Sequence, residues 1–212
     1  MRMEADGAGA RERILGRIRE ALSGRRRPEH PGDLPDGAGA PAPEEDASTA
    51  RRVEAFARRF EASGGQAVLL RDEDEARRWL AGFVESFRHA AVSEGVGEAF
   101  RPDLPGAPPE DADLGVSRAL AAAAQTGSLV LGSGEGRRTQ LLPPVHLVWV
   151  DAADVRATLG GALAAVRNRG PLPAVVALHS GPSKSADIGR IVVTGVHGPG
   201  RVVAAVVGRD SA

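Results

Sequence analysis

The chain contains no cysteine. Without thiolate side chains it can form no disulfide, no zinc–thiolate site and no cysteine nucleophile. It also has no ligands for an iron–sulfur cluster of the usual thiolate type. Any redox centre of that kind would have to be held by another protein.

The chain also lacks an excess of charge of one sign and any long apolar run. Its 27 basic and 28 acidic residues leave a net charge of −1 at pH 7, which argues against charge-driven binding to nucleic acid. No apolar stretch approaches the roughly 20 residues of a membrane span. Four arginines interrupt the region where a signal peptide would have its apolar segment: Arg11, Arg13, Arg17 and Arg19. We therefore expect a soluble cytoplasmic protein.

Aromatic residues are scarce, at 3% against 42% hydrophobic residues in total, so aliphatic side chains have to fill the core. The length of 212 residues suits one compact domain with an appended arm. We predict an amphipathic helix within residues 1–23, a linker rich in proline and glycine over 24–47, and an α/β domain over 48–212. The apolar stripe of the first helix consists of Ile14, Leu15, Ile18 and Leu22. This stripe needs a partner surface, which is either the main domain or another chain, as in a homodimer.

Within the main domain, apolar segments of strand length alternate with segments of helical periodicity. Strands are predicted over residues 66–70, 90–93, 128–131, 145–150, 174–178, 191–196 and 202–207. Helices are predicted after Ser48, after Asp72, over Ser117–Ala124, and from Asp151 or Asp154 to Asn168. Near-continuous apolar strands of this kind favour an α/β fold with a mostly parallel sheet flanked by helices. The last two strands are expected to add an antiparallel hairpin.

Two glycine-containing loops flank the predicted strand at 128–131, and either could contact a ligand. Thr126 and Gly127 precede the strand, where backbone amides could face a ligand, although a simple turn that needs Gly127 is the alternative. The second loop follows the strand and contains Gly132, Gly134, Glu135 and Gly136. Its glycines would let the backbone approach an anion, and Glu135 could act as a carboxylate nucleophile. A plain surface loop is the alternative there.

A third loop, which follows the strand at 174–178, has the richest chemistry. It contains Gly181, Pro182, Ser183, Lys184, Ser185 and Asp187. We expect a helix to begin here, so that hydroxyls, the Lys184 ammonium and free amides together bind a phosphate or carboxylate. Asp187 could orient Lys184 or act as a base. The alternatives are a capped turn held by a Lys184–Asp187 ion pair and a Schiff-base lysine.

The five histidines do not follow a metal-ligand spacing. His197 lies in a turn of glycine and proline, and it could converge with His179 at the end of a strand. We predict neither a metal site nor a cofactor for this chain.

Five segments of the chain resemble the lactate-utilisation LUD-domain family, in particular its protein C type. The most specific are SGPSKSADI at Ser180–Ile188 and VTGVHGPGRV at Val193–Val202. The others are RERILGRIREAL at Arg11–Leu22, QTGSLVL at Gln125–Leu131 and LLPPVHLVWV at Leu141–Val150. Gln125 departs from the family, which often has an acidic residue there.

The resemblance implies a sheet of the type shared with CoA transferases and sugar-phosphate isomerases. It also implies a role beside iron–sulfur partner proteins that oxidise L-lactate to pyruvate. Our leading hypothesis is therefore a non-redox component of such a system, which binds a small anion at residues 181–187. The alternatives are a free-standing isomerase or transferase acting on a sugar phosphate or CoA thioester, and a pure assembly protein.

Overall fold

The computed structural model describes residues 5–24, 47–186, 192–195 and 198–208. The chain divides into two units, residues 1–38 and 39–212. The described part of the first unit is dominated by helix α1 (Ala5–Leu22), which contains the predicted apolar stripe. No helix in the described part of the chain combines the length and apolar character needed to cross a membrane.

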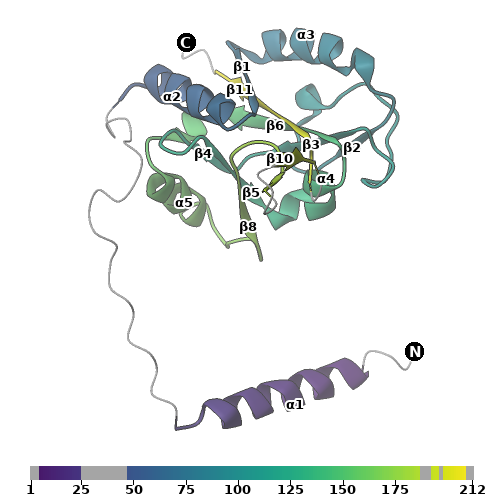
Figure 1. Ribbon diagram of the computed structural model, residues 1–212, viewed down its shortest axis with the longest axis vertical. Helices are drawn as coiled ribbons and strands as arrows, with labels where there is room; N and C mark the ends of the chain where they lie inside the picture. Colours follow the sequence, from purple (N-terminus) through teal and green to yellow (C-terminus); the bar gives the residue numbers. More distant parts are fainter. Residues whose placement is uncertain (1–4, 25–46, 187–191, 196–197, 209–212) are drawn as a thin grey trace. The chain divides into compact units, whose positions relative to one another are not determined.

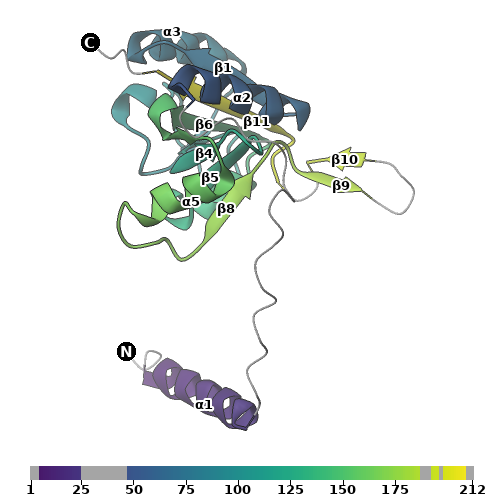
Figure 2. The same ribbon diagram turned by 90° about the vertical axis from the view of Figure 1, so that its left-hand side faces the viewer.

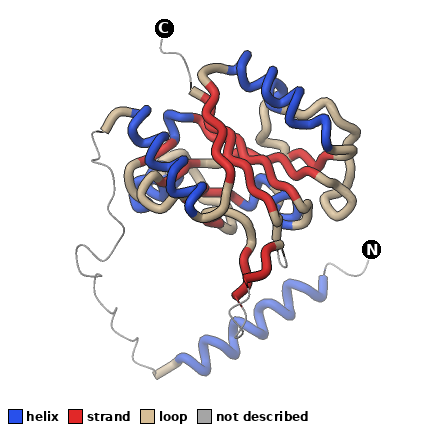
Figure 3. Tube along the Cα trace, turned by 45° about the horizontal axis from the view of Figure 1, so that its top comes forward, coloured by secondary structure: helices blue, strands red, loops and turns tan. Residues whose placement is uncertain are grey.

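The second unit is built on a five-stranded sheet in which every pair of neighbouring strands is parallel. In spatial order its strands are β1 (Gln66–Leu70), β11 (Arg201–Val207), β6 (Val145–Asp151), β3 (Leu114–Arg118) and β2 (Ala90–Val92). The middle strands are buried on both faces, which is why their sequences are almost continuously apolar. Figure 3 shows these strands side by side in red.

Two helices cover opposite faces of this sheet (Figure 1). Helix α2 (Thr49–Ala62) begins at the predicted cap, where the Ser48 hydroxyl accepts a hydrogen bond from the backbone N–H of Arg51. Its rings Phe56 and Phe60 are fully buried in the core on one face. Helix α3 (Glu73–Phe83) also begins as predicted, because Asp72 caps it, and it packs on the other face.

A second sheet lies beside α2, and helix α5 (Leu159–Arg167) packs on it. Its strands are β7 (Val155–Arg156), β4 (Ala121–Ala123), β5 (Ser128–Gly132) and β8 (Val176–His179), in that order. The short helices of the unit are η1 (Val84–Ser86), η2 (Glu98–Phe100), η3 (Ser133–Glu135), α4 (Arg137–Leu141) and η4 (Ala152–Asp154). Strands β9 (Lys184–Ala186) and β10 (Val192–Thr194) form an antiparallel pair that projects from the rest of this unit (Figure 2).

The predicted fold class is confirmed, since a mostly parallel sheet is flanked by helices. The helix predicted over Ser117–Ala124 is wrong, because these residues end β3 and form β4. Alanine favours a helix locally, but here the small side chains of 121–124 are fully buried between packed layers. The later helix begins at Leu159 rather than near Asp151, after the cap Thr158.

The antiparallel hairpin predicted for the last two strands is also wrong. Strand β11 lies between β1 and β6 and is parallel to both, whereas β10 pairs with β9. The strand β11 is buried from Val202 to Val207, and only a central place in a covered sheet buries both faces of such a strand.

Candidate functional site

The structure places the two glycine loops around β5 at opposite ends of that strand. Ser128 begins β5 and Gly132 ends it, and four residue steps of about 3.3 Å separate them by about 13 Å. The antiparallel neighbour β8 pairs His179 with Leu129 and Val176 with Gly132. Residues 181–184 therefore follow β8 at the Ser128 end, and they do not face the Gly132–Gly136 loop.

At the Ser128 end, three hydroxyl groups form a chain. The hydroxyls of Thr126 and Ser128 are 2.7 Å apart, and those of Ser128 and Ser180 are also 2.7 Å apart. Gly127 has a φ of +62°, and a Cβ there would lie 2.5 Å from the backbone nitrogen of Phe60. The turn at Thr126 and Gly127 is thus fixed against α2. This packing agrees with the alternative of a simple turn that needs Gly127.

Residues 181–184 pack near the end of the same helix. A Cβ on Gly181, whose φ is +134°, would lie 2.8 Å from the carbonyl oxygen of Ser63. The Lys184 ammonium donates a hydrogen bond to that carbonyl. The helix predicted for this loop does not begin within its described residues, 181–186, where Lys184 and Ser185 belong to strand β9. The backbone of Ser183 bonds to Pro199 and Gly195 instead, and Pro182 is half-buried beside Gly64.

Two predicted site residues, Asp187 and His197, lie outside the described residues. A buried pair that no sequence pattern indicated, Ser117 and His146, lies close to His179. The Nε2 atom of His146 is 2.7 Å from the Ser117 hydroxyl, and both side chains are fully buried. The ring centroids of His146 and His179 are 6.0 Å apart. Burial, together with the neighbouring His179, lowers the pKa of His146 to about 3, and burial also lowers the pKa of His179.

At the Gly132 end, the loop brings a carboxyl group inward. Glu135 is half-buried and lies against Gly95, where any Cβ would collide with the carboxyl group. The Ser93 hydroxyl donates to the backbone carbonyl of Glu135 and so holds the loop. Burial raises the pKa of Glu135, whereas the backbone N–H and the charge of Arg118 oppose that rise. Gly136 permits the path of the loop, because its φ of +80° is one that glycine adopts readily.

A cavity of about 380 Å³ opens beside Arg118, where the strands of the parallel sheet end. Ligands of open α/β sheets bind at this edge. One wall is apolar and includes Val96, Phe100 and Trp149. The Trp149 indole N–H donates to the carbonyl of Phe100 over 3.0 Å, which fixes that wall. Arg118 is not evident as a site residue from the sequence, because the helical pattern over residues 117–124 hides the end of strand β3.

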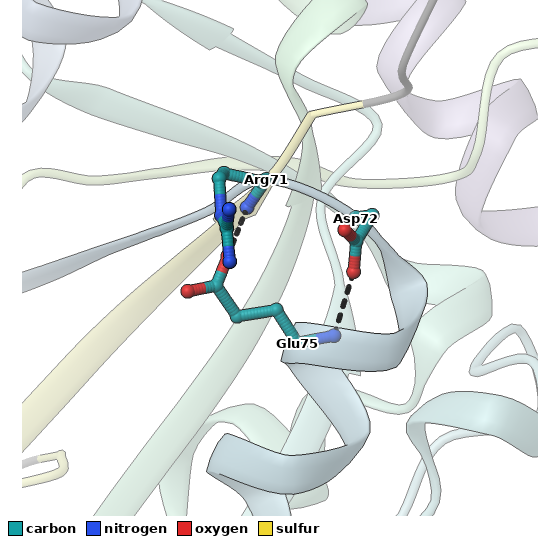
Figure 4. A network of polar contacts seen from close by, with 3 residues as sticks. All are labelled: Arg71, Asp72 and Glu75. Atoms are coloured by element: carbon teal, nitrogen blue, oxygen red, sulfur yellow. Dashed lines mark hydrogen bonds and ion pairs between the residues drawn. The ribbon is translucent and has the colours of Figure 1, made fainter.

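The acidic residues at the rim of this cavity already have partners. Asp72 accepts a hydrogen bond of 2.7 Å from the backbone N–H of Glu75, and Glu75 in turn accepts from the backbone and side chain of Arg71 (Figure 4). Those contacts with Arg71 lower the pKa of Glu75. Glu73 pairs with Arg77, and Asp151 accepts from the backbone N–H of Ala153. Arg118 is the basic residue among those that line this cavity.

Among the described residues, no group of three or more histidine, aspartate or glutamate side chains is placed to hold a metal ion. The candidate site is thus the cavity at the carboxyl ends of the strands, with Arg118 at its edge and Glu135 next to Arg118.

Comparison with known proteins gives a consistent result. Residues 109–207 match the LUD domain family. The chain is 36% identical to lactate utilization protein C of Shouchella clausii over 95 residues, which are 42% of each chain. It is 34% identical to lactate utilization protein C of Halalkalibacterium halodurans over 104 residues, which are 46% of this chain and 45% of that one. The match thus spans less than half the length of these curated relatives.

The fold is also similar to that of a solved structure. The crystal structure of a DUF162 family protein from Deinococcus radiodurans superposes with a TM-score of 0.57 at 21% identity. The similarity covers 76% of this chain and 99% of that one. The resemblance noted in the sequence is therefore confirmed by the matched domain, the named relatives and the shared fold.

Proposed function

We propose that this chain is a non-redox component of a lactate-utilisation system, because residues 109–207 match the LUD domain family. The named relatives support this role, because the proteins from Shouchella clausii and Halalkalibacterium halodurans are both called lactate utilization protein C. The absence of cysteine supports the non-redox assignment, since a thiolate-held iron–sulfur cluster would have to belong to partner proteins.

We further propose that the chain binds a small organic carboxylate in the cavity at the carboxyl ends of the strands. The observation that carries this proposal is that Arg118 lines that cavity and also lies next to the half-buried Glu135. A guanidinium group binds a carboxylate through two parallel N–H donors, while the apolar wall accommodates the carbon skeleton.

The test is a thermal-shift and calorimetry series with L-lactate, pyruvate and 2-ketobutyrate on the full chain. A carboxylate present at about 100 times its Kd stabilises the fold by about 2.7 kcal/mol, which corresponds to roughly 5–10 °C for a chain of this size. Arg118→Gln should abolish the shift, because it removes the charge that pairs with the carboxylate. Arg78→Gln is the matched control, since Arg78 is an exposed arginine on α3 that does not line the cavity.

If a carboxylate raised the melting temperatures of Arg118→Gln and Arg78→Gln equally, it would bind elsewhere. If no carboxylate raised the melting temperature of the unmodified chain, the proposed ligand class would be wrong. The lactate-utilisation role has a separate test. Deleting the coding sequence in its host should abolish growth on L-lactate, and the Arg118→Gln gene should fail to restore that growth.

A second candidate function, that of an isomerase or transferase, is favoured by one observation. The half-buried Glu135 has a raised pKa and lies beside a cation, as a general base or carboxylate nucleophile often does. Turnover of a sugar phosphate or a CoA thioester by the isolated chain, lost in Glu135→Gln with ligand affinity retained, would establish it.

A further inference from the structure

A second cavity, of about 520 Å³, lies along helix α5 on the second sheet. Three arginines from different elements line it: Arg52 of α2, Arg156 of β7, and Arg169 just after α5. No acidic side chain is among its lining residues. We call this site the arginine cavity.

Two of the three arginines are held in place by the fold. The Nε atom of Arg52 donates to the carbonyl of Val155 over 2.9 Å, and a terminal nitrogen donates to the Thr49 hydroxyl over 3.1 Å. These acceptors are neutral, so they leave the charge of Arg52 uncompensated. Arg169 donates to the carbonyl of Leu120 over 2.6 Å and forms an ion pair with Asp154. Both guanidinium groups are therefore fixed at the cavity before any ligand arrives.

The third arginine has an unsatisfied donor. The Nε atom of Arg156 is buried, and it has no hydrogen-bond partner among the described residues. A buried charged donor without an acceptor is unfavourable and rare in native proteins. Arg156 lines the cavity, so a bound anion that drew its guanidinium group outward would give this donor an acceptor.

The first turn of α5 adds to the positive potential of this cavity. Thr158 and Gly161 line the cavity, and the Thr158 hydroxyl accepts from the backbone N–H of Gly161 over 3.0 Å. The side-chain oxygen of Gln125 accepts from the N–H of Leu159 over 3.4 Å. A Cβ at Gly160 would meet nothing within 4 Å, so the helix start is open at that position.

We propose that the arginine cavity binds a phosphorylated small molecule of nucleotide size. Two uncompensated guanidinium groups on separate elements require more than one negative charge, which a single carboxylate lacks. Phosphate oxygens match the planar fork of arginine, and a volume of about 520 Å³ lies within the range of small-molecule sites. This site is separate from the cavity beside Arg118, and the two sites take different ligand classes.

The experiment is calorimetric titration of the full chain with inorganic pyrophosphate, ATP and coenzyme A in a phosphate-free buffer. At least one probe should bind, and higher salt should weaken its binding. Arg156→Gln should weaken binding about tenfold or more, because it removes a charge-assisted contact. It should not lower the melting temperature, because it also removes the unpaired buried donor. Arg156→Lys keeps the charge but loses the fork, and it should bind with intermediate affinity.

Arg167→Gln is the matched control, since Arg167 is exposed in the last turn of α5 and does not line the cavity. The proposal is overturned if no probe binds below about 1 mM, or if Arg156→Gln and Arg167→Gln bind alike. Binding of citrate as tight as that of pyrophosphate would overturn the phosphate assignment. Arg118→Gln should leave pyrophosphate binding unchanged, and Arg156→Gln should leave L-lactate binding unchanged, so the two proposals fail independently.

Discussion

Strand β5 has a glycine-containing loop at each end, but the two loops are built differently. At the Ser128 end, Gly127 brings the chain so close to the backbone of α2 that a side chain would not fit. At the Gly132 end, Gly134 faces open space, and the loop instead holds the half-buried carboxyl group of Glu135. The first loop is required by packing, whereas the second positions a titratable group beside a cavity.

This difference shows that packing against neighbouring residues, and not only contact with a ligand, can require a glycine. From the sequence, the same prediction follows for both loops: a backbone that could approach a ligand. Only the loop at the Gly132 end lies next to Arg118 and the carboxyl ends of the parallel strands. Replacing a glycine by alanine at each end of β5, Gly127 at one end and Gly134 at the other, therefore separates these explanations.

Gly127→Ala should produce the largest effect on stability. The added Cβ would lie 2.5 Å from the nitrogen of Phe60 and 2.7 Å from the carbonyl carbon of Arg59, which are both backbone atoms of α2. The residue would also have to keep a φ of +62°. Strain and overpacking together should destabilise the fold by roughly 2–5 kcal/mol. Thermal unfolding should show a midpoint lower by roughly 4–20 °C.

Gly134→Ala is the matched control at the other end of β5. Its Cβ would have no neighbour within 4 Å, so the midpoint should change by less than about 2 °C. Equal losses in the two variants would contradict the contrast between the loops.

The features that the sequence predicts correctly are those set by nearby residues. The caps Ser48 and Asp72 begin α2 and α3 as expected, because each bonds to an amide three residues ahead. The strand β11 is also found, from its apolar run. Its place between β1 and β6 is not, because strand order depends on contacts between residues more than 50 positions apart.

The same reason explains the outcome for the candidate site. Glu135 is identified from its own loop, but its neighbours Gly95 and Arg118 are far away in sequence. Arg118 is missed because the alanines that follow it favour a helix locally, and only burial between layers makes them a strand. Lys184 is identified as a polar residue of interest, yet its partner Ser63 lies on another element.

The histidine pair at the Ser128 end should make stability depend on acidity. The pKa of His146 is lowered to about 3 in the fold, against 6.5 as its ordinary value. Between these values the unfolded chain binds a proton that the folded chain does not, so stability is lost as the pH falls from 6.5 toward 3. The slope from this group alone approaches about 1.4 kcal/mol per pH unit. His146→Gln should make the loss of stability shallower in urea unfolding at pH 7, 6 and 5.

His89→Gln provides the control for this measurement, because His89 is exposed. Its stability should follow the pH dependence of the unmodified chain. If His146→Gln followed the same curve as His89→Gln, the buried pair would have no role in acid sensitivity.

Replacing Lys184 should have a small effect on stability, and that effect decides between two explanations of the loop at residues 181–187. Its ammonium donates to the carbonyl of Ser63 at the end of α2, where a cation favours the helix dipole. Lys184→Met removes that charge from an exposed position and should destabilise the fold by about 0.3–1 kcal/mol, while Lys184→Arg should retain most of the stability.

If the loop instead binds an anion, as predicted from the sequence, the opposite pattern is expected: unchanged stability and weaker binding of L-lactate, pyruvate or phosphate. Since the loop forms strand β9 rather than a helix start, we expect the first pattern, and both quantities should be measured on the same two variants. Lower anion affinity at an unchanged melting temperature in Lys184→Met would reverse this assignment and restore the loop as a binding site.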